Sequence, residues 1–100
     1  MNPVERLTAA IPSVMRTLLR HAPMSPGKVE AAWRLAVGPA IARATSVALA
    51  GDGTLAVSAT APAWRRELKR SQEVILSRLQ DLLGADTVRR MKVEGRTGRA

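Results

Sequence analysis

The sequence has no cysteine, no phenylalanine, no tyrosine and a single histidine among its 100 residues. Without Cys there can be no disulfide, thiolate metal site or cysteine nucleophile, and the composition suits a reducing cytosol. Without Phe and Tyr, the core must be aliphatic around at most two large rings, Trp33 and Trp64. No apolar run approaches the ~18 residues of a membrane span, and the N-terminus lacks the order of a signal peptide. We therefore expect a cytoplasmic protein that does not associate with membranes.

Acidic residues are also scarce. Lys and Arg total 16 against 8 Asp and Glu, which gives a net charge of +8 and a pI near 11.7. Such a balance predicts a polyanionic partner, most simply nucleic acid. Arg dominates the cations, and its flat, forked donors suit phosphate oxygens. A GC-rich genome is the alternative explanation for Arg over Lys, but it does not account for the few acids.

The residues for catalysis are missing as well. His21 comes at the end of an expected helix, where it fits a dipole partner better than a base. The serines have no His or acid at recognisable triad spacing, the acids form no pair, and there is no phosphate-binding loop or metal-ligand cluster. We expect no enzyme, no cofactor and no metal.

Apolar spacing predicts helices in the first half of the chain. Residues 4–22 have a helical period, and Pro12 either kinks this helix or precedes a second one. Ser25-Pro26 is a typical helix start, a hydroxyl cap followed by Pro at the first helical position. This helix should run to about Val37, and a further turn should follow from Pro39 to about Arg43.

The second half has a change of period. Residues 45–49 and 54–59 alternate around an Asp-Gly turn, which predicts a β-hairpin. One long helix is expected from Pro62 to Leu83, ended by Gly84, and a strand from Thr87 to Val93 should pair in parallel with the hairpin. The expected fold is α+β with the order α-α-β-β-α-β, and the helices cover one face of a three-stranded sheet. We expect a single domain over residues 1–94 and a flexible basic tail over residues 95–100.

Cations gather on the outer side of two of these elements. At about 100° per residue, the basic residues that open the long helix lie beside its apolar stripe, and strict alternation turns two cations of the last strand outward. A solvated helix face is the competing interpretation for such a run. Both Trp residues lie on apolar stripes, so we expect them in the core and not as stacking platforms, and binding should be phosphate-directed with weak sequence specificity. The predicted nucleic-acid-binding residues are Arg65, Arg66, Lys69, Arg70, Arg90 and Lys92.

Several motifs together resemble those of the DciA family. The segment W-R-L-A-V-G-P-A-I-A, residues 33–42, is similar to the family pattern W-x-x-x-V-G-x-x-[IL]-A. The Asp52-Gly53 turn, the pair Ala63-Trp64 and the run L-Q-D-L-L-G at residues 79–84 follow in the family's order. The resemblance extends from about residue 4 to residue 94.

This resemblance implies a KH-like domain of a bacterial protein that loads or operates the replicative DNA helicase and binds DNA, including single strands and forks. The protein would act as a monomer. Its six cations would hold the DNA backbone while another surface docks the helicase. The N-terminal segment with Leu18-Leu19 is a candidate for that surface, although ordinary core packing is the interpretation we favour. An RNA-binding KH-like protein and a protein-interaction adaptor that binds no nucleic acid stay open as alternatives.

Overall fold

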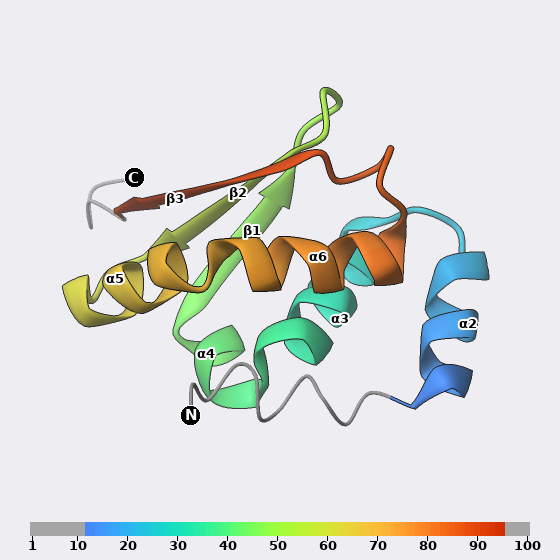
Figure 1. Ribbon diagram of the computed structural model, residues 1–100, viewed down its shortest axis with the longest axis horizontal. Helices are drawn as coiled ribbons and strands as arrows, with labels where there is room; N and C mark the ends of the chain where they lie inside the picture. Colours follow the sequence, from blue (N-terminus) through green and yellow to red (C-terminus); the bar gives the residue numbers. More distant parts are fainter. Residues whose placement is uncertain (1–11, 96–100) are drawn as a thin grey trace.

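The computed structural model describes residues 12–95 and has one open three-stranded sheet with helices packed on one of its faces (Figure 1). The α+β class and the element order are as predicted, whereas the predicted helix before Pro12 and the predicted tail after Gly95 lie outside the described residues. The elements are α2 (Ser13–His21), α3 (Pro26–Val37), α4 (Pro39–Arg43), β1 (Thr45–Leu49), β2 (Thr54–Ala59), α5 (Pro62–Arg70), α6 (Gln72–Leu83) and β3 (Arg90–Gly95).

The helix starts follow the local signals. Of the two alternatives at Pro12, the structure has a helix that begins directly after it. The Ser25 Oγ accepts a hydrogen bond from the Lys28 backbone N–H at 3.1 Å, which caps α3 as predicted. Gly38 separates α3 from α4 with a φ of 90°, a conformation that favours glycine. The expected short helix from Pro39 to Arg43 is confirmed.

The sheet has the order β1-β2-β3, with β1 antiparallel and β3 parallel to the central strand. The predicted hairpin and the predicted parallel pairing are therefore confirmed. The strand β3 begins three residues later than expected, at Arg90, and ends two residues later, at Gly95, which was predicted to begin the tail. The reason for the later start is local, because the backbone N–H groups of Thr87 and Val88 both bond to the Gly84 carbonyl at 3.2 Å and form a turn after α6.

The expected single helix over residues 62–83 is wrong, because it is interrupted at Ser71. This buried residue has φ −97° and ψ 10°, and it is at once the C-cap of α5 and the N-cap of α6. Its backbone N–H bonds to the Glu67 carbonyl and its own carbonyl accepts from Ile75 N–H. Its hydroxyl donates to the Glu67 Oε2 at 3.4 Å, one turn earlier on α5. The helix α5 lies beside the ends of β2 and β3, and α6 continues from it across the molecule toward α2 (Figure 1).

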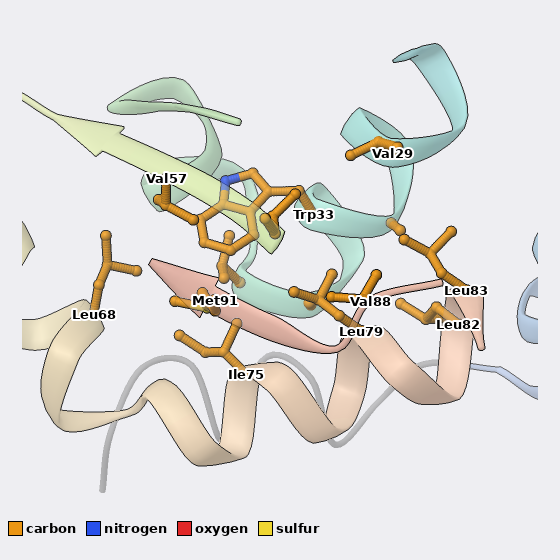
Figure 2. Close-up of a cluster of buried hydrophobic side chains, with 14 of the residues drawn as sticks. Val29, Trp33, Val57, Leu68, Ile75, Leu79, Leu82, Leu83, Val88 and Met91 are labelled. Carbon is orange, nitrogen blue, oxygen red and sulfur yellow. The ribbon is translucent and has the colours of Figure 1, made fainter. Parts of the chain in front are cut away.

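The core lies between the sheet and the helices α3 and α6. The indole ring of Trp33 points from α3 into it, toward Val57 and Met91 (Figure 2). Trp33 is 2% exposed, and its Nε1–H donates to the Thr45 Oγ1 at 2.9 Å. Trp64 is half-buried and packs against the same cluster. The predicted core position is confirmed for Trp33, whereas Trp64 lies at the edge of the core.

Gly53 joins the hairpin to the start of β3. Its φ is +89°, and its carbonyl accepts from the backbone N–H groups of Arg89 at 2.7 Å and Arg90 at 3.2 Å. A Cβ at this position would lie 2.7–3.0 Å from the stem of Arg89. We expect Gly53→Ala to lower the free energy of unfolding by ~1–3 kcal/mol, as measured by urea denaturation. Gly51→Ala is the control, because nothing lies within 4 Å of a Cβ there, and equal stabilities of the two variants would contradict the strain.

Candidate nucleic-acid interface

Three of the predicted cations form an exposed group on α5, which we call the α5 cluster: Arg66, Lys69 and Arg70. Leu68 holds this helix on the protein, because its side chain is completely buried in the hydrophobic core. Because neighbouring residues of a helix differ by about 100°, the three cations that flank this anchor are turned toward solvent. The predicted outward orientation of this helix face is therefore observed.

Arg65 lies on the same helix and behaves differently. Its Nη1 donates to the carbonyls of Ala59 and Thr60, both at 2.8 Å, and the guanidinium lies directly over Gly95. The side chain is half-buried and ties the start of α5 to the ends of β2 and β3. Of the four predicted cations of this helix, Arg65 is the one that holds the others in place.

The break at Ser71 changes the electrostatics of the cluster. In the single long helix that the sequence predicts, cations near the start would oppose the helix dipole. With α5 ending at Arg70, the charges of Lys69 and Arg70 lie in the last turn of α5, where cations are favourable. Glu73 lies in the first turn of α6, where an acid is favourable.

One carboxylate lies close to the α5 cluster. Glu67 Oε1 accepts from Arg70 Nη2 at 3.1 Å, one helical turn away. The Arg70 side chain is nevertheless 76% exposed, against 19% for Glu67. Exposed pairs of this kind stabilise a protein by about 0–1 kcal/mol, so the arginine can exchange this partner for a phosphate. In the described part of the chain, no carboxylate lies within 4 Å of Arg66 or Lys69.

The other two predicted cations lie on the sheet face that no described helix covers. We call Arg90 and Lys92 the sheet-face cations. Arg90 Nη1 donates to Thr54 Oγ1 at 2.9 Å and lies 3.6 Å from the Asp52 carboxylate. Lys92 Nζ lies 3.8 Å from Glu94. Both cations are exposed, so these pairs are also weak.

Asp52 keeps its charge to acidic pH. The backbone N–H of Thr54 donates to its Oδ1 at 3.0 Å, and this bond, followed by the Thr54 hydroxyl and the charge of Arg90, lowers the pKa of Asp52. A lowered pKa means that the carboxylate stabilises the turn at all pH values above its unfolded pKa of about 3.9, and that this contribution is lost as pH falls through the folded pKa. At neutral pH Asp52 is therefore a fixed negative neighbour of Arg90.

The six predicted residues do not form one group. Arg65 contacts Gly95 at the end of β3, while Arg90 begins that strand. Five steps along a strand separate the two by roughly 16 Å, and the side chains of β3 that carry charge point away from the helices. The chain thus presents an α5 cluster and a separate pair of sheet-face cations.

On β1 and β2, the uncovered sheet face is lined by small side chains. Ala48, Ala56 and Lys92 are neighbours across the three strands, and Ser46 and Ser58 form the adjacent row on β1 and β2. Small side chains leave this face flat, so an extended chain can approach the backbone of the sheet closely. The sheet-face cations lie along one side of this surface.

A cleft lined by two arginines was not predicted. A cleft of about 500 Å³ opens between α3, α4 and β1, and two exposed arginines, Arg34 and Arg43, line it together with Glu30 and an edge of Trp33. These arginines belong to two helices separated by the Gly38 break and form no run in the sequence. Only the folded arrangement brings them together, so no local pattern could have indicated the cleft.

One cation has a purely structural role. Lys28 is buried, and its Nζ donates to the carbonyls of Ala22 at 2.7 Å and Arg20 at 3.4 Å, which ties the end of α2 to α3. Among residues 12–95, no group of three or more acidic or histidine side chains could hold a metal ion. Within the same range, no helix has the length and apolar character needed to cross a membrane.

Comparison with known proteins gives one match. A protein-family model described as "Dna[CI] antecedent, DciA" matches residues 6–93. No curated protein and no solved structure matches the chain. The matched range covers most of the sequence and contains both the α5 cluster and the sheet-face cations.

Proposed function

Because this chain belongs to the DciA family, which acts in loading the replicative DNA helicase, we propose that it is a non-enzymatic, DNA-binding accessory factor for that helicase. The observation that carries the DNA-binding part is the α5 cluster, three exposed cations fixed on a helix that Arg65 anchors to the sheet. The net charge of +8 supports a polyanionic partner. The protein acts as a monomer in the cytoplasm, where the helicase works.

The binding mechanism is phosphate neutralisation. Arg66, Lys69 and Arg70 hold one stretch of backbone, and Arg90 and Lys92 hold another, with Arg65 as the positioning residue. Contacts of this kind carry no sequence information. Trp33 is buried in the core and Trp64 is half-buried against it, so the structure offers no exposed aromatic platform among the described residues. Binding is therefore weakly sequence-specific.

The separation of the two cation groups favours a branched substrate. Along β3, Gly95 beside Arg65 lies roughly 10 Å from Lys92 and roughly 16 Å from Arg90, and the two groups face different directions. A single backbone must bend around the end of the sheet to reach both. Two strands that diverge at a fork reach one group each without this bend, so we expect forked DNA to bind more tightly than a single strand.

A salt titration tests the mechanism. If all five exposed cations neutralise phosphates of single strands, log K falls with log salt at a slope of about −3 to −4, measured by fluorescence anisotropy with labelled DNA. A flat response would exclude a phosphate-directed site. RNA of the same sequence is the matched competitor, because only RNA offers a 2′-OH, and tighter binding of RNA would favour the RNA-binding alternative.

The helicase part of the proposal has its own test. The chain is used to capture proteins from bacterial lysate with and without nuclease treatment. Retention of the hexameric replicative helicase after nuclease is expected, since direct contact does not need a DNA bridge. Loss of the helicase on nuclease treatment would mean that the two proteins only share a strand of DNA.

A further inference from the structure

The helix α2 exposes its apolar side chains. Leu18 is 68% exposed, Val14 62% and Met15 42%, and no residue of α2 is buried. Scattered apolar residues on a surface are normal, but three on one side of a nine-residue helix form a contiguous patch. The sequence favours ordinary core packing for both Leu18 and Leu19. Leu19 is half-buried against the core, whereas Leu18 is not.

The contacts that hold α2 on the molecule lie away from Leu18 and Val14, and Leu19 supplies the apolar one by packing against the core. Arg16 Nη1 bonds to Asp81 of α6 at 2.8 Å, on the side of α2 that also carries Leu19. The Lys28 Nζ holds the end of the helix through the Ala22 carbonyl at 2.7 Å. At about 100° per residue, Leu18 and Val14 are turned roughly 130–170° away from the contact with α6. The fold therefore holds α2 with its apolar side outward.

The patch continues into a groove between α2 and α3. The groove has a volume of about 500 Å³, and its surface is almost entirely apolar. Met15, Leu18, Leu19 and Ala22 line it from α2, and Ala31, Arg34 and Leu35 line it from α3. The small side chains of Ala22 and Ala31 leave room along its length. A groove between two helices is the shape that receives the side-chain ridge of a third helix.

The charge at the groove is basic. Among the described residues that line it, Arg34 is the charged one, and α2 carries no acid. Arg16 is paired with Asp81, while within residues 12–95 no carboxylate lies within 4 Å of Arg20 or Arg34. An occupant with acidic residues beside its apolar stripe matches this charge. A second copy of the chain does not match it, because each copy brings a charge of +8 and the same cations.

We infer that the groove between α2 and α3 docks an amphipathic helix of the replicative helicase that carries acidic residues beside its apolar stripe. This inference rests on the proposed function and gives it a second surface. The groove and the α5 cluster lie at opposite ends of the molecule, with α6 between them (Figure 1). Both partners therefore bind at once, and the chain bridges helicase and DNA.

Two variants of the full-length chain test the docking, each with the purified replicative helicase of the same bacterium. Leu18→Glu places a charge in the apolar lining, and Ala31→Met fills the groove from α3 without adding charge. Central apolar contacts dominate interfaces, so we expect each variant to weaken binding by about 30-fold or more, measured by calorimetry without DNA. Thr17→Glu is the matched control, because Thr17 is exposed and about 100° from Leu18 on the same helix.

Binding of single-stranded DNA is the second measurement, and all three variants should keep it within about twofold. Unchanged helicase binding by both Leu18→Glu and Ala31→Met, with the wild type binding, would overturn the groove and leave the proposed function standing. Failure of the wild type to bind would overturn the helicase part of the function together with the groove. If circular dichroism shows that Leu18→Glu has lost its helical structure, the helicase affinity of Ala31→Met alone tests the groove.

A photo-crosslinking residue at position 18 identifies the occupant, with one at position 17 as control. We expect position 18 to crosslink to a helicase segment with apolar residues at helical spacing and flanking acids. Crosslinks to a second copy of the chain, or binding to phosphatidylglycerol vesicles that Leu18→Glu abolishes while helicase binding persists, would overturn the proposed occupant.

Discussion

Reversing the α5 cluster with Arg66→Glu, Lys69→Glu and Arg70→Glu is expected to weaken binding of single-stranded DNA by roughly 100-fold at low salt. Each exposed cation–phosphate pair is worth up to about 1 kcal/mol, so removing three of these pairs weakens binding by about 3 kcal/mol, and repulsion adds to this. The salt slope should become less steep by about 2, because three fewer phosphates are neutralised, at about 0.7 each. Fluorescence anisotropy over a series of salt concentrations measures both quantities.

A second triple variant controls for net charge. Arg20→Glu, Arg34→Glu and Arg43→Glu changes the charge by the same amount at exposed positions away from α5. If the site is local, this variant should keep most of the DNA affinity and most of the salt slope. Equal losses of affinity in the two variants would show that DNA responds to the overall charge and would remove the α5 cluster as a site.

Arg65 is left out of the variant for a structural reason. Its guanidinium holds the carbonyls of Ala59 and Thr60, so its replacement leaves two acceptors without their donor and loosens α5 itself. A fall in DNA affinity would then report on the position of the helix and not on a phosphate contact. The six predicted cations therefore divide into one anchor and five candidates for direct contact.

Local signals predicted most elements of this fold because each signal acts over a few residues. The Ser25-Pro26 start, the Gly38-Pro39 break and the Gly84 stop work through neighbouring backbone groups, so the sequence alone placed them. The break at Ser71 escaped the same reasoning. The apolar stripe passes through it without a change of period, since Leu68 and Ile75 are both buried, and a serine is a weak signal beside a proline or a glycine.

The sites depend on tertiary arrangement and were predicted less completely. The alternation along β3 correctly turned Arg90 and Lys92 outward, but it does not show how far they lie from α5. The Arg34–Arg43 cleft needs the packing of α4 beside β1. Leu18 is exposed because α2 turns Arg16 and Leu19 toward the rest of the molecule. Arg16 bonds there to Asp81, which is 65 residues away in the sequence. None of these is visible in a helical or strand period.

The largest effect on stability is expected at Trp33, the one large ring completely inside the core. Replacing it with Ala removes this ring from among Val57, Met91 and the side chains of α6 (Figure 2). Such truncations cost about 3–5 kcal/mol, and a domain of this size has only about 5–15 kcal/mol in total. We expect Trp33→Ala to be largely unfolded near 37 °C, as measured by thermal denaturation followed by circular dichroism.

Two milder variants separate the ring from its hydrogen bond. Trp33→Phe keeps an aromatic ring but loses the Nε1–H that donates to Thr45, and Thr45→Val removes the acceptor together with the hydroxyl that donates to the Ile41 carbonyl at 2.8 Å. A net hydrogen bond contributes about 1 kcal/mol, so each should cost less than Trp33→Ala. If Trp33→Phe is as unstable as Trp33→Ala, the hydrogen bond to Thr45, and not the buried volume, holds α3 on the sheet. Since α3 also carries one wall of the proposed helicase groove, loosening it at Trp33 should weaken helicase binding before it affects DNA binding at α5.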